Sequence, residues 1–142
     1  MNERKEFIPP NFYRVSTKAL ILDATRTKFL IVQEDNGKWE FPGGGLDYGL
    51  EPQENVAREL QEEMGIKTLS VAELPSYVMP AQHDRTGSWI LQLFYETTVA
   101  NLDFTPSREC NACQFVDKDS LPGLMYSNVP QFAAMFDPEN HL

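Results

Sequence analysis

Three glutamates that lie close together in the sequence carry the clearest chemical signal of this chain. Glu59, Glu62 and Glu63 belong to the segment Arg-Glu-Leu-Gln-Glu-Glu-Met-Gly-Ile at residues 58–66. On a helix that turns about 100° per residue, the three side chains share one face, where like charges cost on the order of 0.2–0.5 kcal/mol per pair. Such a helix needs either bulk water or a nearby cation, and a hard divalent cation with oxygen ligands is the natural partner. Such an ion neutralises phosphate charge and acidifies water, which favours hydrolytic chemistry.

The same segment has an apolar face that can fix a helix on a core. Four apolar residues recur at helical spacing, namely Val56, Ala57, Leu60 and Met64. This periodicity predicts an amphipathic helix over residues 52–64 with its acidic face outward. Pro52 suits the first helical position and Gly65 a left-handed stop, so both ends of the helix are marked.

A glycine-rich segment precedes the predicted helix. Residues 39–41 indicate the end of a strand, and Pro42, Gly43, Gly44 and Gly45 follow as a predicted turn. Glycines allow another group to approach the backbone closely. Backbone carbonyls and amides would therefore be exposed beside the acidic helix.

The stretch from Gly44 to Ile66 closely resembles the Nudix box, the signature of hydrolases that cleave a nucleoside diphosphate linked to another moiety. The box reads Gly, five residues, Glu, seven residues, Arg-Glu-aliphatic-x-Glu-Glu-x-Gly-aliphatic. The matching positions are Gly44, Arg58, Glu59, Leu60, Glu62, Glu63, Gly65 and Ile66. The resemblance implies metal-dependent hydrolysis of a diphosphate bond in a nucleoside triphosphate, a dinucleoside polyphosphate or a nucleotide sugar.

The resemblance also implies roles for single residues. Glu59, Glu62 and Glu63 would be metal ligands for Mg²⁺ or Mn²⁺. The carbonyl of Gly43 or Gly44 would add a further oxygen. One of the carboxylates would take the proton from the attacking water, and the resemblance leaves open which one.

A further acid is expected outside the box. The family often places a glutamate in the loop before a late strand that begins with an aromatic residue, and Glu109 ahead of Phe115 is similar to it. Glu109 is therefore expected to be catalytic and to bind the metal. Glu96 and Asp103 are weaker alternatives.

One position departs from the box. The first glutamate of the motif falls on Leu50. In the family this glutamate pairs with the box arginine, which orients the metal-binding acids. Arg58 should then pair with Glu54 one helical turn earlier, or with Glu51. We expect lower activity or weaker metal affinity than in a box that keeps the glutamate.

The remaining sequence predicts one α/β domain over residues 1–142. Strands are expected at residues 17–22, 29–33, 38–41, 68–74, 77–79, 89–99 and 114–116. Ser127 or Asn128 could cap a last helix over residues 131–136, with Phe132, Met135 and Phe136 packed inward. Strands and two helices suggest layers, as in the Nudix-type α/β/α sandwich with a mixed β-sheet.

Composition excludes several classes of function. A net charge of −9 over 142 residues argues against a nucleic acid polymer as partner. No apolar run approaches the roughly 20 residues that cross a membrane, and the charged start lacks the apolar part of a secretory signal. Cys110 and Cys113 have no further ligands at zinc spacing, so they are expected to be reduced thiols. We expect a cytoplasmic protein.

The substrate is the least determined part. Lys38, Arg85 and Arg108 are candidates for contacts with phosphates. Several aromatic residues could stack on a base, namely Phe12, Tyr13, Trp39, Tyr48, Tyr77, Trp89 and Tyr126. A catalytically weak domain that binds a nucleotide or regulates a partner is the alternative function, favoured by Leu50. Dimers are frequent in the family, so a homodimer is expected.

Overall fold

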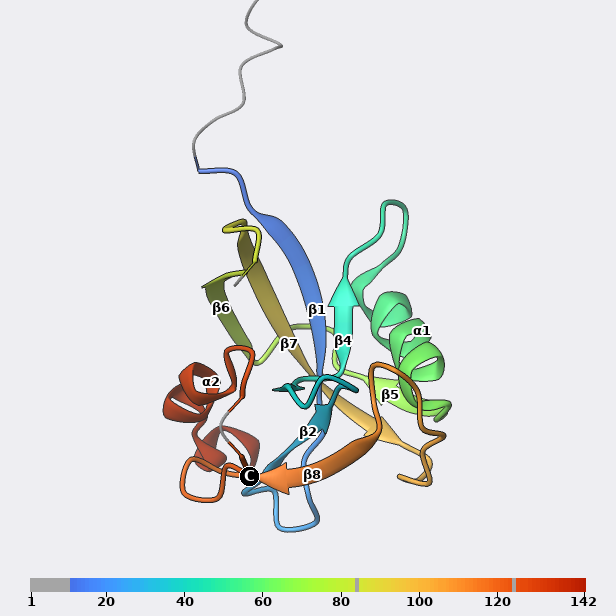
Figure 1. Ribbon diagram of the computed structural model, residues 1–142. Helices are drawn as coiled ribbons and strands as arrows, with labels where there is room; N and C mark the ends of the chain where they lie inside the picture. Colours follow the sequence, from blue (N-terminus) through green and yellow to red (C-terminus); the bar gives the residue numbers. More distant parts are fainter. Residues whose placement is uncertain (1–10, 84, 124) are drawn as a thin grey trace, which may run out of the picture.

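The computed structural model describes residues 11–83, 85–123 and 125–142. Within these ranges the chain forms β-strands and two α-helices (Figure 1). The strands are β1 (Arg14–Leu20), β2 (Phe29–Gln33), β3 (Trp39–Glu40), β4 (Gly43–Gly45), β5 (Thr68–Val71), β6 (Tyr77–Gln82), β7 (Trp89–Val99) and β8 (Ala112–Val116). The helices are α1 (Pro52–Met64) and α2 (Val129–Met135), and a 3₁₀ helix, Pro138–His141, follows α2. The prediction of a single domain over residues 1–142 extends to residues 1–10, 84 and 124, which lie outside the described residues.

The long strand β7 holds the larger sheet together. It pairs in parallel with β1, and antiparallel with β6 and β5, while β4 pairs antiparallel with β1. A smaller antiparallel sheet has the order β3-β2-β8. Parallel and antiparallel pairs occur together, which confirms the predicted mixed β-sheet.

Two cores lie on the two faces of the strands. Side chains alternate between the faces of a strand, so Ala19 joins one core and Leu20 the other, as do Leu30 and Ile31 on β2. Helix α1 packs on the core that contains Ala19, and α2 packs on the core that contains Leu20. Figure 1 shows the two helices on opposite sides of the strands. The predicted α/β/α sandwich is thereby confirmed.

Helix α1 and strands β2 and β7 have the predicted bounds. Strand β1 begins earlier than predicted, and β6 continues past Pro80 to Gln82. Proline is tolerated there because, among the described residues, β6 pairs only with β7 and so lies at an edge. Strands β3, β5 and β8 differ from the predicted ranges only at their ends.

The glycines after Pro42 are a strand and not a turn. Gly43, Gly44 and Gly45 pair with Lys18, Thr17 and Ser16 of β1. The prediction of a turn was wrong because this pairing is a contact between distant segments that local residue preference does not reveal. The strand lies beside β1 on the side that faces α1, and the chain leads from it into α1 (Figure 1).

The ends of α1 are fixed as its sequence predicts. Pro52 occupies the first turn, and Gly65 ends the helix with φ of 66°. Glu51 and Glu54 form a capping box, in which the Glu54 carboxylate accepts a hydrogen bond from the Glu51 amide at 3.1 Å. Both glutamates are therefore engaged at the start of the helix.

The last helix is displaced from its predicted range. It begins after Asn128, whose side chain makes no capping hydrogen bond, so the predicted side-chain cap is wrong. Phe132 is buried and Phe136 partly buried, as expected, but Met135 is 37% exposed. None of the helices in the described ranges has the length and apolar character needed to cross a membrane.

Candidate active site

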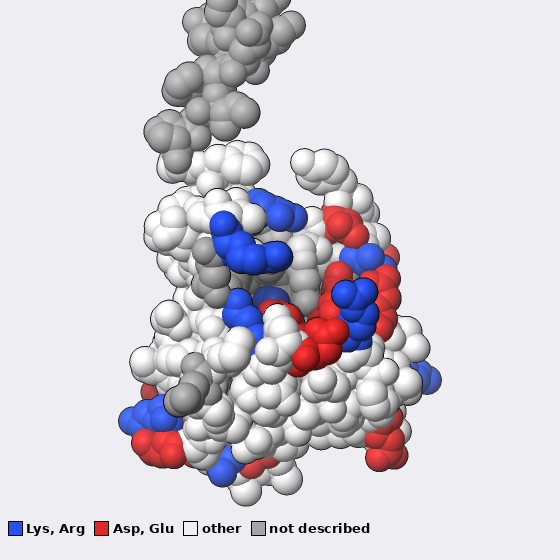
Figure 2. All heavy atoms as spheres, viewed as in Figure 1, with Lys and Arg blue, Asp and Glu red and all other residues white. Residues whose placement is uncertain are grey.

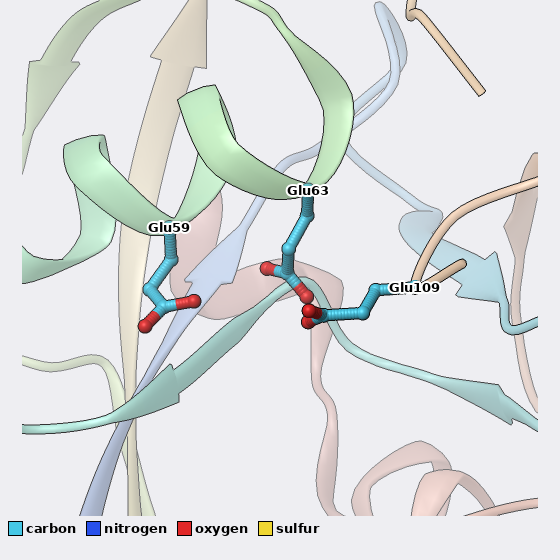
Figure 3. Close-up of side chains that lie close together, drawn as sticks. All are labelled: Glu59, Glu63 and Glu109. Carbon is cyan, nitrogen blue, oxygen red and sulfur yellow. The ribbon is translucent and has the colours of Figure 1, made fainter. Parts of the chain in front are cut away.

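Three carboxylates converge at one edge of α1. Glu59 and Glu63 extend from successive turns of the helix, and Glu109 reaches toward them from the loop before β8 (Figure 3). One oxygen from each residue lies within 4.8 Å of the other two. Glu63 is buried, Glu59 is half-buried and Glu109 is exposed. The cluster is therefore open to solvent on the side of Glu109.

Strand β4 presses its backbone against two of these acids. The Gly43 amide donates a hydrogen bond to Glu63 Oε1 at 2.9 Å. A Cβ atom on Gly44 would lie 2.9 Å from the Glu59 carboxylate, and a Cβ on Gly43 would lie 2.3 Å from the Thr17 carbonyl oxygen. Only glycine leaves room for this approach, so β4 places backbone groups beside the carboxylates.

The acids are held in an environment that disfavours their charge. Burial raises the pKa of Glu63 to about 9, although the Gly43 amide and Lys18 oppose the shift, and the Glu109 carboxyl shares a hydrogen bond with Glu63. Burial also raises the pKa of Glu59, against the effect of Arg58. Near neutral pH the cluster therefore retains a proton, which a cation would replace. Three converging carboxyl groups whose charge is unfavourable without a cation fit a hard divalent ion.

Glu62 does not join this cluster. Its side chain is 56% exposed and its Oε1 lies 3.5 Å from Arg58 Nη1. On a helix, Glu63 lies about 40° from Glu59 around the axis, whereas Glu62 lies about 60° away on the other side. The structure thus brings together Glu59, Glu63 and Glu109 and leaves Glu62 at the rim.

A cavity of about 520 Å³ lies next to β4 and is also lined by residues of β1 and β7. We call it the basic cavity. Its cationic lining residues are Arg14, Lys18, Lys38 and Arg85. Figure 2 shows Lys and Arg side chains along one side of a hollow, and Asp and Glu side chains mixed with other Lys and Arg side chains along the other. Gly43 and Gly44 line the cavity as well as approaching the carboxylates, so the two features form one site. Its charges suit an anion held beside a cation.

Comparison with known proteins agrees with this geometry. A family model described as the NUDIX domain matches residues 12–136. This chain belongs to the Nudix family. The resemblance of the stretch from Gly44 to Ile66 to the Nudix box is therefore confirmed.

Several relatives share the Nudix core. A MutT-like protein of Streptomyces ambofaciens is 36% identical over 67 residues, which are 47% of this chain and 44% of that protein. An 8-oxo-dGTP diphosphatase of Escherichia coli (strain K12) is 40% identical over 57 residues, 39% of this chain and 44% of the relative. The alignments thus span less than half the length of these curated relatives. A crystal structure of UDP-X diphosphatase has the same fold, with a TM-score of 0.67, 23% identity, and coverage of 86% of this chain and 61% of the other.

The arginine of the Nudix box has a partner that the sequence did not suggest. Arg58 Nη2 lies 2.7 Å from Asp47 Oδ2 and donates a hydrogen bond to Asn55 Oδ1 at 2.8 Å. Pairing with Glu54 or Glu51 was expected and is wrong, because these two residues form the capping box instead. Arg58 also lies 3.4 Å from Glu59 and so connects the loop before α1 to the carboxylate cluster.

Asn55 is a buried polar residue next to the site that the motif does not name. Its side chain is fully buried and its amide donates to Thr17 Oγ1 at 2.9 Å and to the Gly45 carbonyl at 3.0 Å. It thereby joins α1, β1 and β4 behind the cluster. A signal existed, because Asn55, Glu59 and Glu63 form a polar stripe with a spacing of four residues beside the apolar stripe of α1.

Two of the three cations predicted to contact phosphates lie at the basic cavity. Lys38 and Arg85 line the basic cavity, but Arg108 is exposed and lies 3.7 Å from Asp35. Arg14 and Lys18 were missed. They lie four residues apart on β1, an even spacing that places both side chains on the same face of the strand, and both line the cavity.

Two further acids, Glu34 and Glu40, line the basic cavity. Glu34 shares a hydrogen bond with Glu40, and this contact together with burial raises the pKa of Glu34 to about 8. Burial opposes ionisation of Glu40, but Lys18 at 3.4 Å outweighs it and lowers the Glu40 pKa. Protonated Glu34 can donate a hydrogen bond, which adds a neutral donor among the cations.

The aromatic candidates divide into buried and exposed residues. Trp39 and Tyr77 are part of the core around α2 and are not available for stacking. Tyr48 is fully exposed in the loop between β4 and α1. Of the alternative acids, Glu96 pairs with Arg26 and does not belong to the carboxylate cluster.

Proposed function

We propose that this protein is a Nudix hydrolase that cleaves a diphosphate bond in a small substrate containing a nucleoside diphosphate, and that it requires Mg²⁺ or Mn²⁺. One observation carries the proposal: three carboxylates within 4.8 Å adjoin a cavity lined by four cationic side chains. Diphosphates resist hydrolysis because their oxygens repel a nucleophile. A site that combines metal ligands with cations can offset this charge.

The residues have separate parts in the proposed reaction. Glu59, Glu63 and Glu109 would hold the divalent ion, and the backbone of Gly43 lies beside them. When bound, the ion would neutralise phosphate charge and acidify water. Arg14 and Lys18 would hold the phosphates in the cavity.

Glu62 and Arg58 complete the proposed catalytic set. Arg58 would position Glu59, which it contacts, while Glu62 stays paired with Arg58 as a further acid on the same helix. Glu109 is the exposed carboxylate of the cluster and is the one we propose to accept the proton from water.

Release of phosphate products from a panel of substrates tests the proposal. The panel contains a nucleoside triphosphate, a dinucleoside polyphosphate and a nucleotide sugar, each with Mg²⁺, with Mn²⁺ and with chelator. We expect turnover that depends on the metal and falls by at least about 100-fold in Glu63→Gln. Glu54→Gln, an exposed change at the far end of α1, serves as the control and should stay near the wild-type rate.

The alternative is a catalytically weak nucleotide-binding or regulatory domain, and Leu50 in the box favours it. Tight nucleotide binding without turnover on any compound of the panel would support this alternative and overturn the enzyme proposal. The pairing of Arg58 with Asp47 at 2.7 Å supports the enzyme, because it supplies the arginine with a carboxylate.

The expected surroundings of the protein are proposals as well. We propose that it acts in the cytoplasm on small nucleotides and not on a nucleic acid polymer, in line with a net charge of −9. We also propose a homodimer. Light scattering during size-exclusion chromatography measures the mass, and a monomer at working concentration would contradict it.

A further inference from the structure

A second groove lies next to the basic cavity and is mostly apolar. It has a volume of about 690 Å³ and lies between the start of β1 and the loop that connects β4 to α1. Its apolar and aromatic lining residues are Phe12, Tyr13, Val15, Leu46, Tyr48 and Leu50. We call this feature the aromatic groove. The proposed reaction at the carboxylate cluster does not use it.

The aromatic side chains of this groove are unusually open to water. Phe12 is 64% exposed, Tyr13 43% and Tyr48 103%. Single exposed aromatics are ordinary, but three that line one groove offer flat apolar faces at one place. Such faces stack on planar rings, and each stacked base contributes enough that its loss weakens binding measurably.

The groove is continuous with the proposed active site. Arg14 lines both the basic cavity and the aromatic groove. Its Nη2 would lie 3.7 Å from a Cβ atom on Gly45, the last residue of β4. Asp47 lines the groove and contacts Arg58 of α1. A chain of phosphates that passes Arg14 would therefore have one end in the cavity and the other at the groove.

We propose that the aromatic groove binds a planar ring at the second end of the substrate, beyond the phosphates that Arg14 contacts. The occupant has an anionic linker, which matches Arg14, and an uncharged ring, which matches Tyr48 and its neighbours. This inference rests on the proposed function and narrows it. A substrate with a ring at both ends, such as a dinucleoside polyphosphate, is favoured over a nucleoside triphosphate with one ring.

The test compares diadenosine tetraphosphate with ATP as substrates of the wild type, Tyr48→Ala and Tyr48→Phe. The selectivity is the ratio of kcat/KM for diadenosine tetraphosphate to that for ATP. We expect Tyr48→Ala to lower this ratio about tenfold through KM, and Tyr48→Phe to preserve it because the ring remains. Leu74→Ala removes an exposed apolar side chain that does not line the groove and is the matched control. An unchanged ratio in Tyr48→Ala would overturn the proposal.

Binding separates this inference from the proposed function. Should the wild type hydrolyse neither compound, titration calorimetry of diadenosine tetraphosphate with the wild type and with Tyr48→Ala still tests the groove. An affinity about tenfold lower in Tyr48→Ala supports the groove as a binding site. Equal affinity of the two proteins, or no binding by either, refutes it.

Discussion

Replacing Asp47 by alanine removes the carboxylate nearest to Arg58 and tests how this chain works without a glutamate at position 50. The Asp47 oxygen lies 2.7 Å from Arg58, whereas Glu59 and Glu62 lie 3.4 Å and 3.5 Å from it. In Asp47→Ala the guanidinium keeps, among the residues that the structure describes, only these two acids as ionic partners. Its charge then competes with a metal ion for Glu59.

The expected change in stability is small, whereas the change in metal affinity is large. Side chains of Asp47 and Arg58 are 62% and 37% exposed, and exposed ion pairs contribute about 0–1 kcal/mol to the free energy of unfolding. Groups that orient a metal ligand without touching the ion typically change affinity about 10–100-fold. We expect Asp47→Ala to weaken Mn²⁺ binding about tenfold and to lower Tm by no more than about 5 °C.

Titration calorimetry of metal-free protein with Mn²⁺ measures the affinity, and thermal unfolding of the same samples measures Tm. Asp119→Ala removes an exposed acid that does not belong to the carboxylate cluster and is the control. Leu50→Glu should restore the affinity of Asp47→Ala, because a glutamate returns to the box. Wild-type affinity in Asp47→Ala, or no rescue by Leu50→Glu, would refute the reasoning.

Three further predictions concern Asn55, Gly44 and Glu63. Asn55→Ala should lower the free energy of unfolding by about 1–3 kcal/mol in denaturant titrations, because buried hydrogen-bond partners are left unsatisfied; Gln53→Ala on the same helix should cost less. Gly44→Ala should abolish Mn²⁺ binding in calorimetry with the fold retained by circular dichroism, since a Cβ would lie 2.9 Å from Glu59; an unchanged affinity would contradict the close approach. The pKa of Glu63 is raised to about 9 in the folded protein, so above about pH 5 the folded state keeps a proton that the unfolded state releases. Stability of the metal-free protein should therefore fall as pH rises from about 5 toward 9, and a profile as flat as that of Glu63→Gln would show this to be wrong.

The sequence predicted the helix and its acids because both follow from local periodicity. The apolar stripe that includes Val56, Leu60 and Met64 set the bounds of α1, and Gly65 set its end. The same geometry placed Glu59 and Glu63 together. Recognition of the box depended on the spacing of residues along the sequence from Gly44 to Ile66, so the tertiary structure was not needed for it.

Features that depend on contacts between distant segments were not predicted. Strand β4 forms through pairing of its glycines with β1, which is distant in the sequence. Arg58 pairs with Asp47, a residue of the loop before α1 and not of the helix itself. Glu62 was grouped with Glu59 on helical spacing and on the box, whereas in the structure its carboxylate lies beside Arg58 at the rim. Arg14 was missed because the strand was predicted to begin only at residue 17, after Arg14.

The central claim is that Glu59, Glu63 and Glu109 jointly bind one divalent cation. Titration of metal-free protein with Mn²⁺, followed by electron paramagnetic resonance of the free ion, tests it most directly. We predict saturable binding in the wild type that is lost in Glu63→Gln and weakened in Glu109→Gln, with Glu73→Gln as an unaffected control. Binding that is absent from the wild type, or equally tight in Glu63→Gln, would contradict the account.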